Sequence, residues 1–376
     1  MSNRMKLGDV ATVVMGQAPP GGACNKDGIG EPFVKAGEFK EPYPVIREWT
    51  TAPTKRAQSG DVLVCVVGAT AGKINLGIDC VIGRSVAAVR PLLTRLDTHY
   101  LYHFLVTKTL VLRASSQGMA QGVITREMLL ETEIPLPPLE EQRRIAAILD
   151  KASHLNQLST HLDSLRRQAG ESLYLSLFGD PIVNPHELPS QKIGEIADCQ
   201  LGKMLDKKRQ HGNSSRPYLR NANVRWFDVN TEDCLCMDIE ESEMDRFGVM
   251  HGDLLVCEGG EPGRSAIWKG ESGAYGFQKA LHRIRPKKDI LTPQFLNWSL
   301  WILAQRGLLL DHITSATIAH LTREKLVQIE VPLPPMSTQK LFAQRLDKIE
   351  NLLAHSAFRQ KLLSSLRLSL VSEFLV

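Results

Sequence analysis

Short apolar stretches interrupted by glycine, proline and asparagine make up residues 1–138. Within this part, residues 62–67 (Val-Leu-Val-Cys-Val-Val) form a continuous apolar run that predicts a buried strand. Residues 97–107 predict a helix. Pro135 to Pro138 then form a turn that can continue neither a helix nor a central strand. This pattern is typical of an irregular sheet with a few helices.

The pattern changes at Leu139. Residues 140–178 contain no proline and a single glycine, Gly170. Apolar side chains recur there every seven residues, with further leucines between them, which is the pattern of a helix that pairs with another helix. The positions are Ile148, Leu155, Leu158, Leu162, Leu165 and Ala169. We therefore expect one long helix with a helical partner.

A glycine-proline segment, residues 179–189, ends this helix and opens a second globular region. Residues 336–374 are then free of both proline and glycine and predict another long helix. Its apolar stripe consists of Leu346, Ile349, Leu353, Leu363, Leu366 and Leu370. Because the first helix carries the chain away to the second region, the second helix must run back to pack along it. We expect an antiparallel pair with an approximate two-fold axis and with the chain ends close together.

The second half of the chain repeats the first in the same order. Residues 134–139 (Ile-Pro-Leu-Pro-Pro-Leu) return as residues 331–336 (Val-Pro-Leu-Pro-Pro-Met), 197 residues later. Other matches lie 186 to 197 residues apart, and insertions in loops would produce such a drift. They pair 6–11 with 192–197, 60–65 with 252–257, 90–91 with 285–286, and 125–127 with 322–324. Two copies of a long unit indicate a tandem duplication and not a solenoid.

These patterns predict an α+β fold in which two globular, mixed α/β domains are joined by two long antiparallel helices that resemble a coiled coil. The first domain spans residues 1–138, a central helical spacer 139–180, the second domain 181–335 and a C-terminal helical spacer 336–376. The 376 residues are enough for two or three domains with real cores. Two copies of one domain are suited to a target in two parts.

Composition places the chain among soluble globular proteins, with 43% hydrophobic and 23% charged residues. The longest apolar runs are shorter than the about 18 residues that a membrane span needs, and the first residues lack the apolar stretch of a signal peptide. We therefore expect a cytoplasmic protein without membrane contact. Its seven cysteines are odd in number and scattered, which argues against a zinc site.

Two short segments resemble catalytic motifs, but neither motif is complete. Residues 68–73 (Gly-Ala-Thr-Ala-Gly-Lys) resemble a phosphate-binding P-loop, but the glycine spacing is one residue short and Ile74 stands where Ser or Thr would hold magnesium. Glu38 and Lys40 have the spacing of a nuclease Glu-x-Lys, without the Pro-Asp that should precede it. We expect a binding protein, not an enzyme, with neither a metal nor a cofactor of its own.

A net charge of +4 permits nucleic acid as a partner. The loop Gly-x-x-x-Gly-Lys/Arg carries a cation at the same place in both copies, Lys73 and Arg264, and its glycines would let the backbone approach a phosphate. Arginine can also read guanine edges. The candidate DNA-binding residues are Lys73, Arg84, Lys203, Lys207, Lys208, Arg209, Arg220, Arg225, Arg264 and Lys279. For each of them, a solvated surface charge is the alternative.

Two motifs resemble a known family. One is the proline-rich turn at residues 136–142 (Leu-Pro-Pro-Leu-Glu-Glu-Gln), and the other is residues 176–181 (Ser-Leu-Phe-Gly-Asp-Pro), where the long helix leads into the second domain. In both, the chain resembles the specificity subunits of type I restriction–modification systems, and the resemblance covers essentially its whole length. The C-terminal copy departs from the pattern, with Ser337 and Thr338 in place of two glutamates. The resemblance implies two target-recognition domains, each followed by a helical spacer.

The family also implies a function. Each recognition domain would read one half of a split target in double-stranded DNA, and the two helices would fix the spacing between the halves. Two methyltransferase subunits would dock on the chain and methylate adenine with S-adenosylmethionine, and restriction–translocase subunits would use ATP and magnesium. The chain itself would hold no cofactor. The helix positions expected to serve packing or subunit contact are Gln142, Ile145, Leu149, Leu155, Leu162, Gln339, Leu346 and Ile349.

Two other functions remain open from the residues alone. A coiled-coil adaptor with two protein-binding domains would share this architecture, as would the specificity part of another methyltransferase–nuclease system. A fused methyltransferase would need an Asn-Pro-Pro-aromatic or Asp-Pro-Pro-Tyr motif, whereas both Pro-Pro pairs here follow leucine. Because the domains diverge between their matched segments, we expect the halves of the target to differ.

Overall fold

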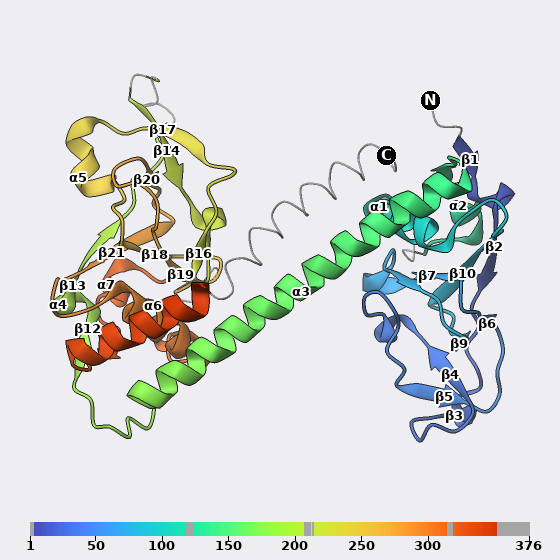
Figure 1. Cartoon of the computed structure of the whole chain (residues 1–376), viewed down its shortest axis with the longest axis horizontal. Coiled ribbons are helices and arrows are strands. Elements are labelled where there is room, and N and C mark those ends of the chain that lie inside the picture. The colour runs from blue at the N-terminus through green and yellow to red at the C-terminus, as the bar shows by residue number, and fades with distance from the viewer. Residues whose placement is uncertain (1–3, 118–122, 207–211, 213, 314–318, 352–376) are drawn as a thin grey trace. The chain divides into compact units, whose positions relative to one another are not determined.

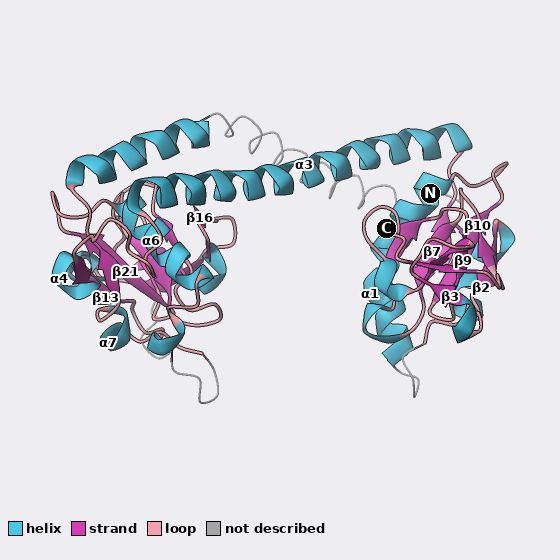
Figure 2. Cartoon of the chain, turned by 90° about the horizontal axis from the view of Figure 1, so that it is seen from below, coloured by secondary structure: helices cyan, strands magenta, loops and turns pink. Residues whose placement is uncertain are grey.

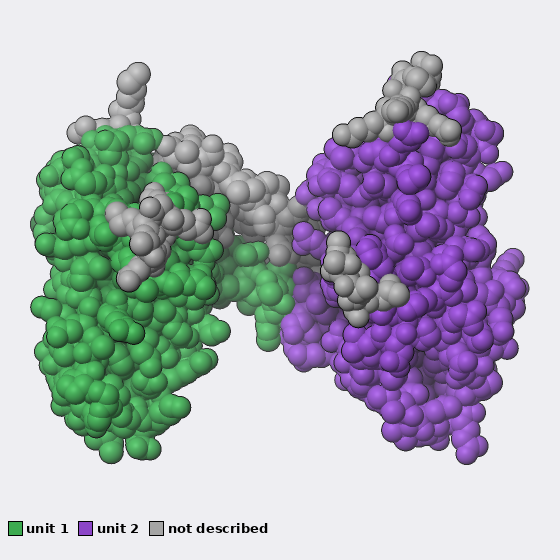
Figure 3. All heavy atoms as spheres, turned by 180° about the vertical axis from the view of Figure 1, so that it is seen from behind, with its two compact units in different colours: residues 1–161, 356–376 green, residues 162–355 purple. Residues whose placement is uncertain are grey.

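A computed structural model describes residues 4–117, 123–206, 212, 214–313 and 319–351. They form two compact units, which we call unit 1 (residues 1–161) and unit 2 (residues 162–355) (Figures 1 and 3). The division lies inside the longest helix, α3 (Leu139–Phe178), which confirms the long helix expected over residues 140–178. The domain bounds set from the sequence stay a prediction.

Unit 1 is built on a four-stranded antiparallel sheet in the order β2-β10-β7-β8. Its strands are β2 (Ala11–Met15), β7 (Val62–Cys65), β8 (Ile74–Leu76) and β10 (Val86–Pro91). Every residue of β7 is buried, and its side chains enter two hydrophobic cores alternately. Because successive side chains of a strand point to opposite faces, a strand covered on both sides is apolar throughout. This explains the apolar run that predicted a buried strand.

Helices cover one face of this sheet, and a second sheet covers the other (Figure 1). The helices are α1 (Thr98–Gln117), α2 (Arg126–Leu130) and the first turns of α3. The outer sheet has the order β3-β5-β4-β9-β6, in which β4 and β9 run parallel. Its strands are β3 (Cys24–Asn25), β4 (Glu31–Val34), β5 (Glu48–Thr50), β6 (Arg56–Ala57) and β9 (Cys80–Ile82). Short 3-10 turns are η1 (Leu7–Asp9), η2 (Gly21–Ala23), η3 (Ala36–Glu38) and η4 (Gly68–Thr70).

Unit 2 repeats the inner half of unit 1. Its sheet β13-β21-β18-β19 has the same antiparallel arrangement, and β12 (Ser190–Lys192) pairs with β22 (Glu330–Pro332) as β1 (Arg4–Lys6) pairs with β11 (Glu133–Pro135). Helix α6 (Pro293–Gln305) takes the place of α1, and its N-cap Thr292 accepts a hydrogen bond from the Phe295 N–H. The other elements are α4 (Ile193–Ile196), β13 (Ala197–Leu201), β18 (Leu254–Cys257), β19 (Ser265–Ile267), β21 (Leu281–Pro286) and α7 (Arg323–Leu326).

The outer half of unit 2 is organised differently. It contains a sheet in the order β17-β14-β20 and a hairpin of β15 and β16. Strand β14 pairs in parallel with β20, as β4 does with β9 in unit 1. The strands are β14 (Ser215–Leu219), β15 (Val224–Arg225), β16 (Asp228–Val229), β17 (Leu235–Asp238) and β20 (Gly276–Phe277). The helical turns are η6 (Asn221–Asn223), η7 (Glu241–Glu243), α5 (Met244–Phe247) and η8 (Leu310–His312).

An ion pair occupies the same place in both inner sheets. Two nitrogens of Arg90 lie 2.8 Å from the two carboxylate oxygens of Asp61, and Arg285 contacts Asp253 in the same way at 2.7 and 2.8 Å. Both carboxylates are buried. All four residues belong to the sequence matches 60–65 with 252–257 and 90–91 with 285–286. The duplication seen in the sequence therefore extends to the ion pair that each inner sheet contains.

Within unit 2, the helix at residues 336–351 packs on the last turns of α3 and runs antiparallel to them (Figure 2). The ring of Phe342 lies 5.9 Å from that of Tyr174 and 5.3 Å from that of Phe178. Gly179, with φ of +75°, ends α3 in the left-handed conformation that glycine favours. The rest of the expected helix pairing, and the expected closeness of the chain ends, involve residues outside the described ranges.

The middle of α3 is more exposed than its ends. Leu158 and Leu165 of the expected seam are 43% and 42% exposed. The side chains that anchor α3 in the two cores are Ile145, Ala146 and Leu149 near its start and Tyr174 and Phe178 near its end. Within the described ranges, no helix combines the length and the apolarity that crossing a membrane requires.

Candidate nucleic-acid interface

The loop between β7 and β8 of unit 1 carries the candidate Lys73. Its backbone closes on itself, because the Gly72 N–H donates to the Cys65 carbonyl at 2.8 Å and the Cys65 N–H donates to the Lys73 carbonyl at 2.8 Å. Gly72 has φ of +83°, and a Cβ there would lie 2.8 Å from the Thr109 carbonyl oxygen, so only glycine fits. The Lys73 side chain is exposed, and within the described part of the chain no carboxylate pairs with it.

The corresponding loop of unit 2 has the same backbone but a different cation. The Gly263 N–H donates to Cys257 at 3.0 Å, and the Cys257 N–H donates to the Arg264 carbonyl at 2.8 Å. The Arg264 guanidinium, however, is 3.2 Å from the Glu261 carboxylate and donates to the Asn221 carbonyl at 3.1 Å. Only 23% of the Arg264 side chain is exposed. As far as the described residues show, the loop therefore carries an unpaired cation in unit 1 and a paired one in unit 2.

Arg84 and Lys279 occupy equivalent turns, which precede β10 and β21. Each turn is tied to the glycine loop by one backbone hydrogen bond, from Val66 to Ser85 at 2.9 Å in unit 1 and from Glu258 to Ala280 at 3.0 Å in unit 2. Both cationic side chains are exposed. In each unit the structure thus brings a turn cation and a loop cation into one region.

Lys203 belongs to the same region of unit 2, because its carbonyl accepts the Lys279 N–H at 2.9 Å. Its ammonium group pairs with Glu243. Arg225 lies in the β15–β16 hairpin, is exposed, and has no ion-pair partner among the described residues. The other candidates, Lys207, Lys208 and Arg209, lie outside the described ranges.

Arg220 follows β14, and the structure shows a counterpart that the sequence analysis missed. Arg220 is ion-paired with Asp233 at 2.7 Å, and Lys35, which follows β4, is ion-paired with Glu48 at 2.7 Å. Both pairs are related by an offset of 185 residues. The signal in the sequence was the match of residues 32–35 (Pro-Phe-Val-Lys) with 217–220 (Pro-Tyr-Leu-Arg) at that offset.

Two glutamines fasten the spacer helices to their units by equivalent hydrogen bonds. Gln142 is fully buried; its side-chain oxygen accepts the Asp97 N–H at 2.9 Å, and its amide donates to the carbonyls of Arg95 and Pro137 at 3.0 and 2.8 Å. Gln339 is equally buried and makes the same three bonds in unit 2, to Thr292, Ile290 and Pro334, at 2.8, 3.0 and 3.0 Å. These two positions pack the helix starts on the starts of α1 and α6.

The apolar helix candidates fall into two groups. Ile145 and Leu149 are buried in the core of unit 1, and Leu346 is buried in the core of unit 2. Leu155, Leu162 and Ile349 are half-buried. The first group packs the spacers on their own units, and the second group lies farther along the helices.

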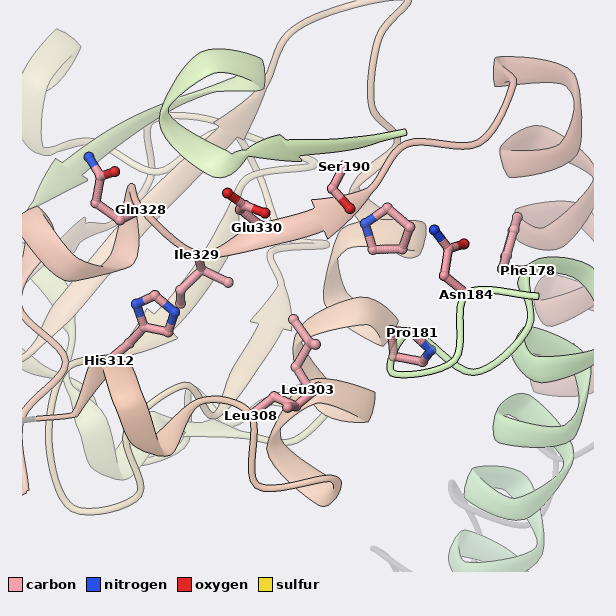
Figure 4. Close-up of a pocket in the computed structure, with 11 residues that line it drawn as sticks. Phe178, Pro181, Asn184, Ser190, Leu303, Leu308, His312, Gln328, Ile329 and Glu330 are labelled. Carbon is pink, nitrogen blue, oxygen red and sulfur yellow. The ribbon is translucent and has the colours of Figure 1, made fainter. Parts of the chain in front are cut away.

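The cysteine thiols at the ends of the equivalent strands β7 and β18 are buried. Burial raises the pKa of the Cys65 thiol to about 12 and that of the Cys257 thiol to about 11, so both stay protonated at neutral pH. Within the described ranges, no group of His, Cys, Asp and Glu has the geometry to hold a metal ion. A cavity of about 390 Å³ in unit 2 lies between the end of α3 and the β12–β22 pair, with Phe178, His312 and Glu330 among its walls (Figure 4). It contains none of the candidate cations.

Comparisons with a family model and with individual proteins all indicate the same family. The model of the type I restriction modification DNA specificity domain matches residues 2–164 and 185–362. The MjaX type I restriction enzyme specificity subunit of Methanocaldococcus jannaschii is 32% identical over 148 residues, which are 39% of this chain and 35% of that protein. The MjaVIII specificity subunit of the same organism is 23% identical over 348 residues, 87% of this chain and 78% of that protein.

A solved structure shows the same fold. The crystal structure of a type I restriction–modification S subunit from M. genitalium superposes with a TM-score of 0.64 at 16% identity, over 99% of this chain and 95% of that one. The two-domain α+β architecture expected from the sequence is thereby confirmed.

Proposed function

Because the chain belongs to the type I restriction–modification DNA specificity family and serves DNA recognition, we propose that each of its two units reads one half of a two-part duplex target. The observation that carries the proposal is the matched set of cations, with Lys73, Arg84 and Lys35 in unit 1 and Arg264, Lys279 and Arg220 in unit 2. In each unit these come from one glycine loop, one turn and one strand end.

Linking two recognition units on one chain compensates for the limited discrimination that a single half-site allows. A half-site of a few base pairs discriminates by about 1–3 kcal/mol per base pair, which is too little for a unique site in a genome. Once one unit is bound, the second binds as if intramolecularly, and affinity rises without new contacts. The buried Gln142 and Gln339 support this role, because they hold each spacer helix firmly on its unit.

The chemistry of modification and cleavage belongs, in this proposal, to other chains. Two methyltransferase subunits would use S-adenosylmethionine to methylate one adenine in each half-site, and restriction–translocase subunits would use ATP and magnesium. The chain would hold no cofactor, perform no catalysis and act in the cytoplasm. The exposed Leu158 and Leu165 on α3 are candidates for contact with these partners.

The test is a comparison of DNA methylation in the native host with and without this gene. Sequencing of methylated adenines should show the loss of one split motif, with two short specified halves around a fixed number of unspecified bases. Restoring the gene on a plasmid should restore the motif. If the methyltransferase partner is present and active but no motif depends on this chain, the proposed function is wrong.

A further inference from the structure

A cavity occurs at the same place in both units, where the spacer helix, the start of α1 or α6, and the edge strand of the inner sheet meet. Its volume is about 240 Å³ in unit 1 and about 410 Å³ in unit 2. Three spacer-helix positions line both cavities at the offset of 197 residues, and two positions of α1 and α6 do so at the offset of 195. The pairs are Asp150 with Asp347, Ser153 with Glu350, His154 with Asn351, His99 with Gln294, and Tyr102 with Asn297. The two cavities are therefore equivalent.

The apolar walls of the two cavities are also alike. Each has one aliphatic residue of the edge strand and two aromatic rings, which are Leu76, Tyr43 and Tyr102 in unit 1 and Ile267, Phe227 and Trp298 in unit 2. In unit 1 the Leu76 N–H donates to the Pro42 carbonyl at 2.8 Å, and in unit 2 the Phe227 N–H donates to the Ser265 carbonyl at 3.0 Å. These bonds hold the segment with the outer ring on the edge strand. A side chain that enters either cavity would bury apolar atoms against these walls.

Carboxylates line the cavity of unit 1 together with the rings. Asp150 is 41% exposed and lies 2.8 Å from both His99 and His103. Because a carboxylate can accept about four hydrogen bonds, these two contacts do not exhaust it. The exposed Glu41 adds a second carboxylate to the same cavity.

The cavity of unit 2 has its carboxylates on the spacer helix. Glu350 is bound to Lys269 at 2.8 Å, whereas the exposed Asp347 has no ion-pair partner among the described residues. Each unit thus places a carboxylate at the same helix position beside two aromatic rings. Lysine and arginine fit such a cavity, because they have an apolar stem and a cationic end that aromatic faces and carboxylates both attract.

The lining positions of α3 form a face of their own. Asp150, Ser153, His154 and Gln157 follow one another at steps of three, four and seven residues, which places them on one side of the helix. The expected pairing positions Leu155, Leu158, Leu162 and Leu165 lie about a third of a turn away, at about 100° per residue. Pairing of the spacer helices along those leucines would therefore not fill the cavity.

We propose that each cavity receives one basic side chain, a lysine or an arginine, from a protein partner that binds the chain in two copies, one on each unit. The proposal rests on the proposed function, in which this partner is the methyltransferase subunit. The stem would pack against the aromatic rings, and the charge would meet the carboxylate of Asp150 or Asp347. These carboxylates would repel the phosphates of DNA. Because both cavities offer the same groups, the same side chain of the partner fits both.

The test uses the complete chain assembled with the methyltransferase of its own host, and native mass spectrometry counts the bound copies. Asp347→Asn removes the charge of an exposed residue without an ion pair among the described residues, so the chain should fold as before. We expect the affinity for one of the two copies to fall by roughly tenfold or more, so that complexes with a single copy accumulate. Asp311→Asn, at an exposed carboxylate of η8 that lines neither cavity, is the matched control and should keep both copies. Unchanged binding of both copies to the Asp347→Asn chain would overturn the proposal.

Photo-cross-linking gives a second measurement that does not depend on the folding of that variant. Benzoylphenylalanine replaces Ser153 in one chain and Glu350 in another. We expect both positions to cross-link to the same segment of the methyltransferase, and that segment to contain a lysine or an arginine. Cross-links to different segments, to DNA, to residues 352–376 of the chain itself, or none to the methyltransferase would each overturn the proposal. If the unaltered chain binds no methyltransferase, the proposed function is wrong instead.

Discussion

Lys73 of unit 1 and Arg264 of unit 2 occupy the same place in the same loop, but among the described residues only Arg264 is paired with a carboxylate. In unit 2, Lys203, Arg220 and Arg264 are paired with the carboxylates of Glu243, Asp233 and Glu261. In unit 1, Lys35 is paired with Glu48 as Arg220 is with Asp233, but Lys73 and Arg84 have no such partner among the described residues. A fixed arginine presents its donors in one orientation, which favours reading of bases, whereas a free lysine is a mobile point charge, which favours contact with phosphates.

The buried contacts differ much less between the units. The ion pairs Asp61–Arg90 and Asp253–Arg285 have nearly the same geometry, and so do the hydrogen bonds of Gln142 and Gln339. The duplication has therefore kept the contacts that hold strands and helices together, whereas the environment of the glycine-loop cation has diverged. Four predictions test this contrast, from the largest expected effect to the smallest.

The largest effect is expected from the buried ion pairs. Arg90→Ala leaves the Asp61 carboxylate buried without its partner, and Arg285→Ala does the same to Asp253. Each should lower the free energy of unfolding by about 3 kcal/mol, because an unpaired buried charge is strongly destabilising. Denaturant unfolding of the variants checks this. Similar losses would confirm that the units share this support, and a loss below about 1 kcal/mol in either would contradict it.

The glutamines should come next. Gln142→Ala leaves one backbone N–H and two backbone carbonyls without their partner, and Gln339→Ala leaves the equivalent three groups. The expected loss is about 2 kcal/mol for each, from unpaired buried polar groups. Hydrogen exchange of the Asp97 and Thr292 amides is a direct readout, and both should exchange faster. Gln157→Ala, on an exposed face of α3, is the control and should change neither.

A third prediction concerns a contact that only unit 1 possesses. Asp150 on α3 lies 2.8 Å from both His99 and His103 on α1, whereas the equivalent Asp347 has no ion-pair partner among the described residues. Asp150→Ala should cost about 1–2 kcal/mol, as expected for a hydrogen bond to a charged group, and Asp347→Ala about none. Equal losses in unfolding experiments would show that the two helix starts are fastened alike.

The same contact has a defined pH dependence. Burial acts to raise the pKa of Asp150, but the hydrogen bond from His103 and the charges of both histidines outweigh it, so the pKa is lowered. A carboxylate with a lowered pKa stabilises the folded state above its unfolded pKa of about 4, and the contribution is lost as pH falls through the lower folded value. The difference in stability between the native chain and Asp150→Ala should therefore shrink below about pH 4.

The smallest effect on stability is expected at the exposed cations. Lys73→Gln and Lys279→Gln should each change the free energy of unfolding by less than about 0.5 kcal/mol. Their effect should appear in DNA binding by the complex with the methyltransferase, where each should reduce the slope of log affinity against log salt by about one. The motif should stay the same. A change in the motif would show that these cations read bases and do not merely contact phosphates.

The sequence predicted the fold well wherever a pattern is repeated along the chain. The apolar runs of β7 and β18 and the proline-free span of α3 indicate strands and a helix from local spacing alone. The candidate site was harder to predict. Lys35 was missed because its match to Arg220 lies in short strands at a different offset, and Gln142 was assigned to packing or partner contact without its bonding partners.

What the sequence by itself determined was the duplication, the two buried strands, the long central helix and the family. These follow from periodicity and from repeated segments, which do not depend on where distant residues lie. Only the tertiary structure decided that Arg264 is paired with Glu261, that Lys73 has no carboxylate partner within the described ranges, and that Gln142 bonds to Asp97. Such choices depend on which groups meet after folding, and residues 45 apart in the chain meet only because α1 and α3 pack in one core.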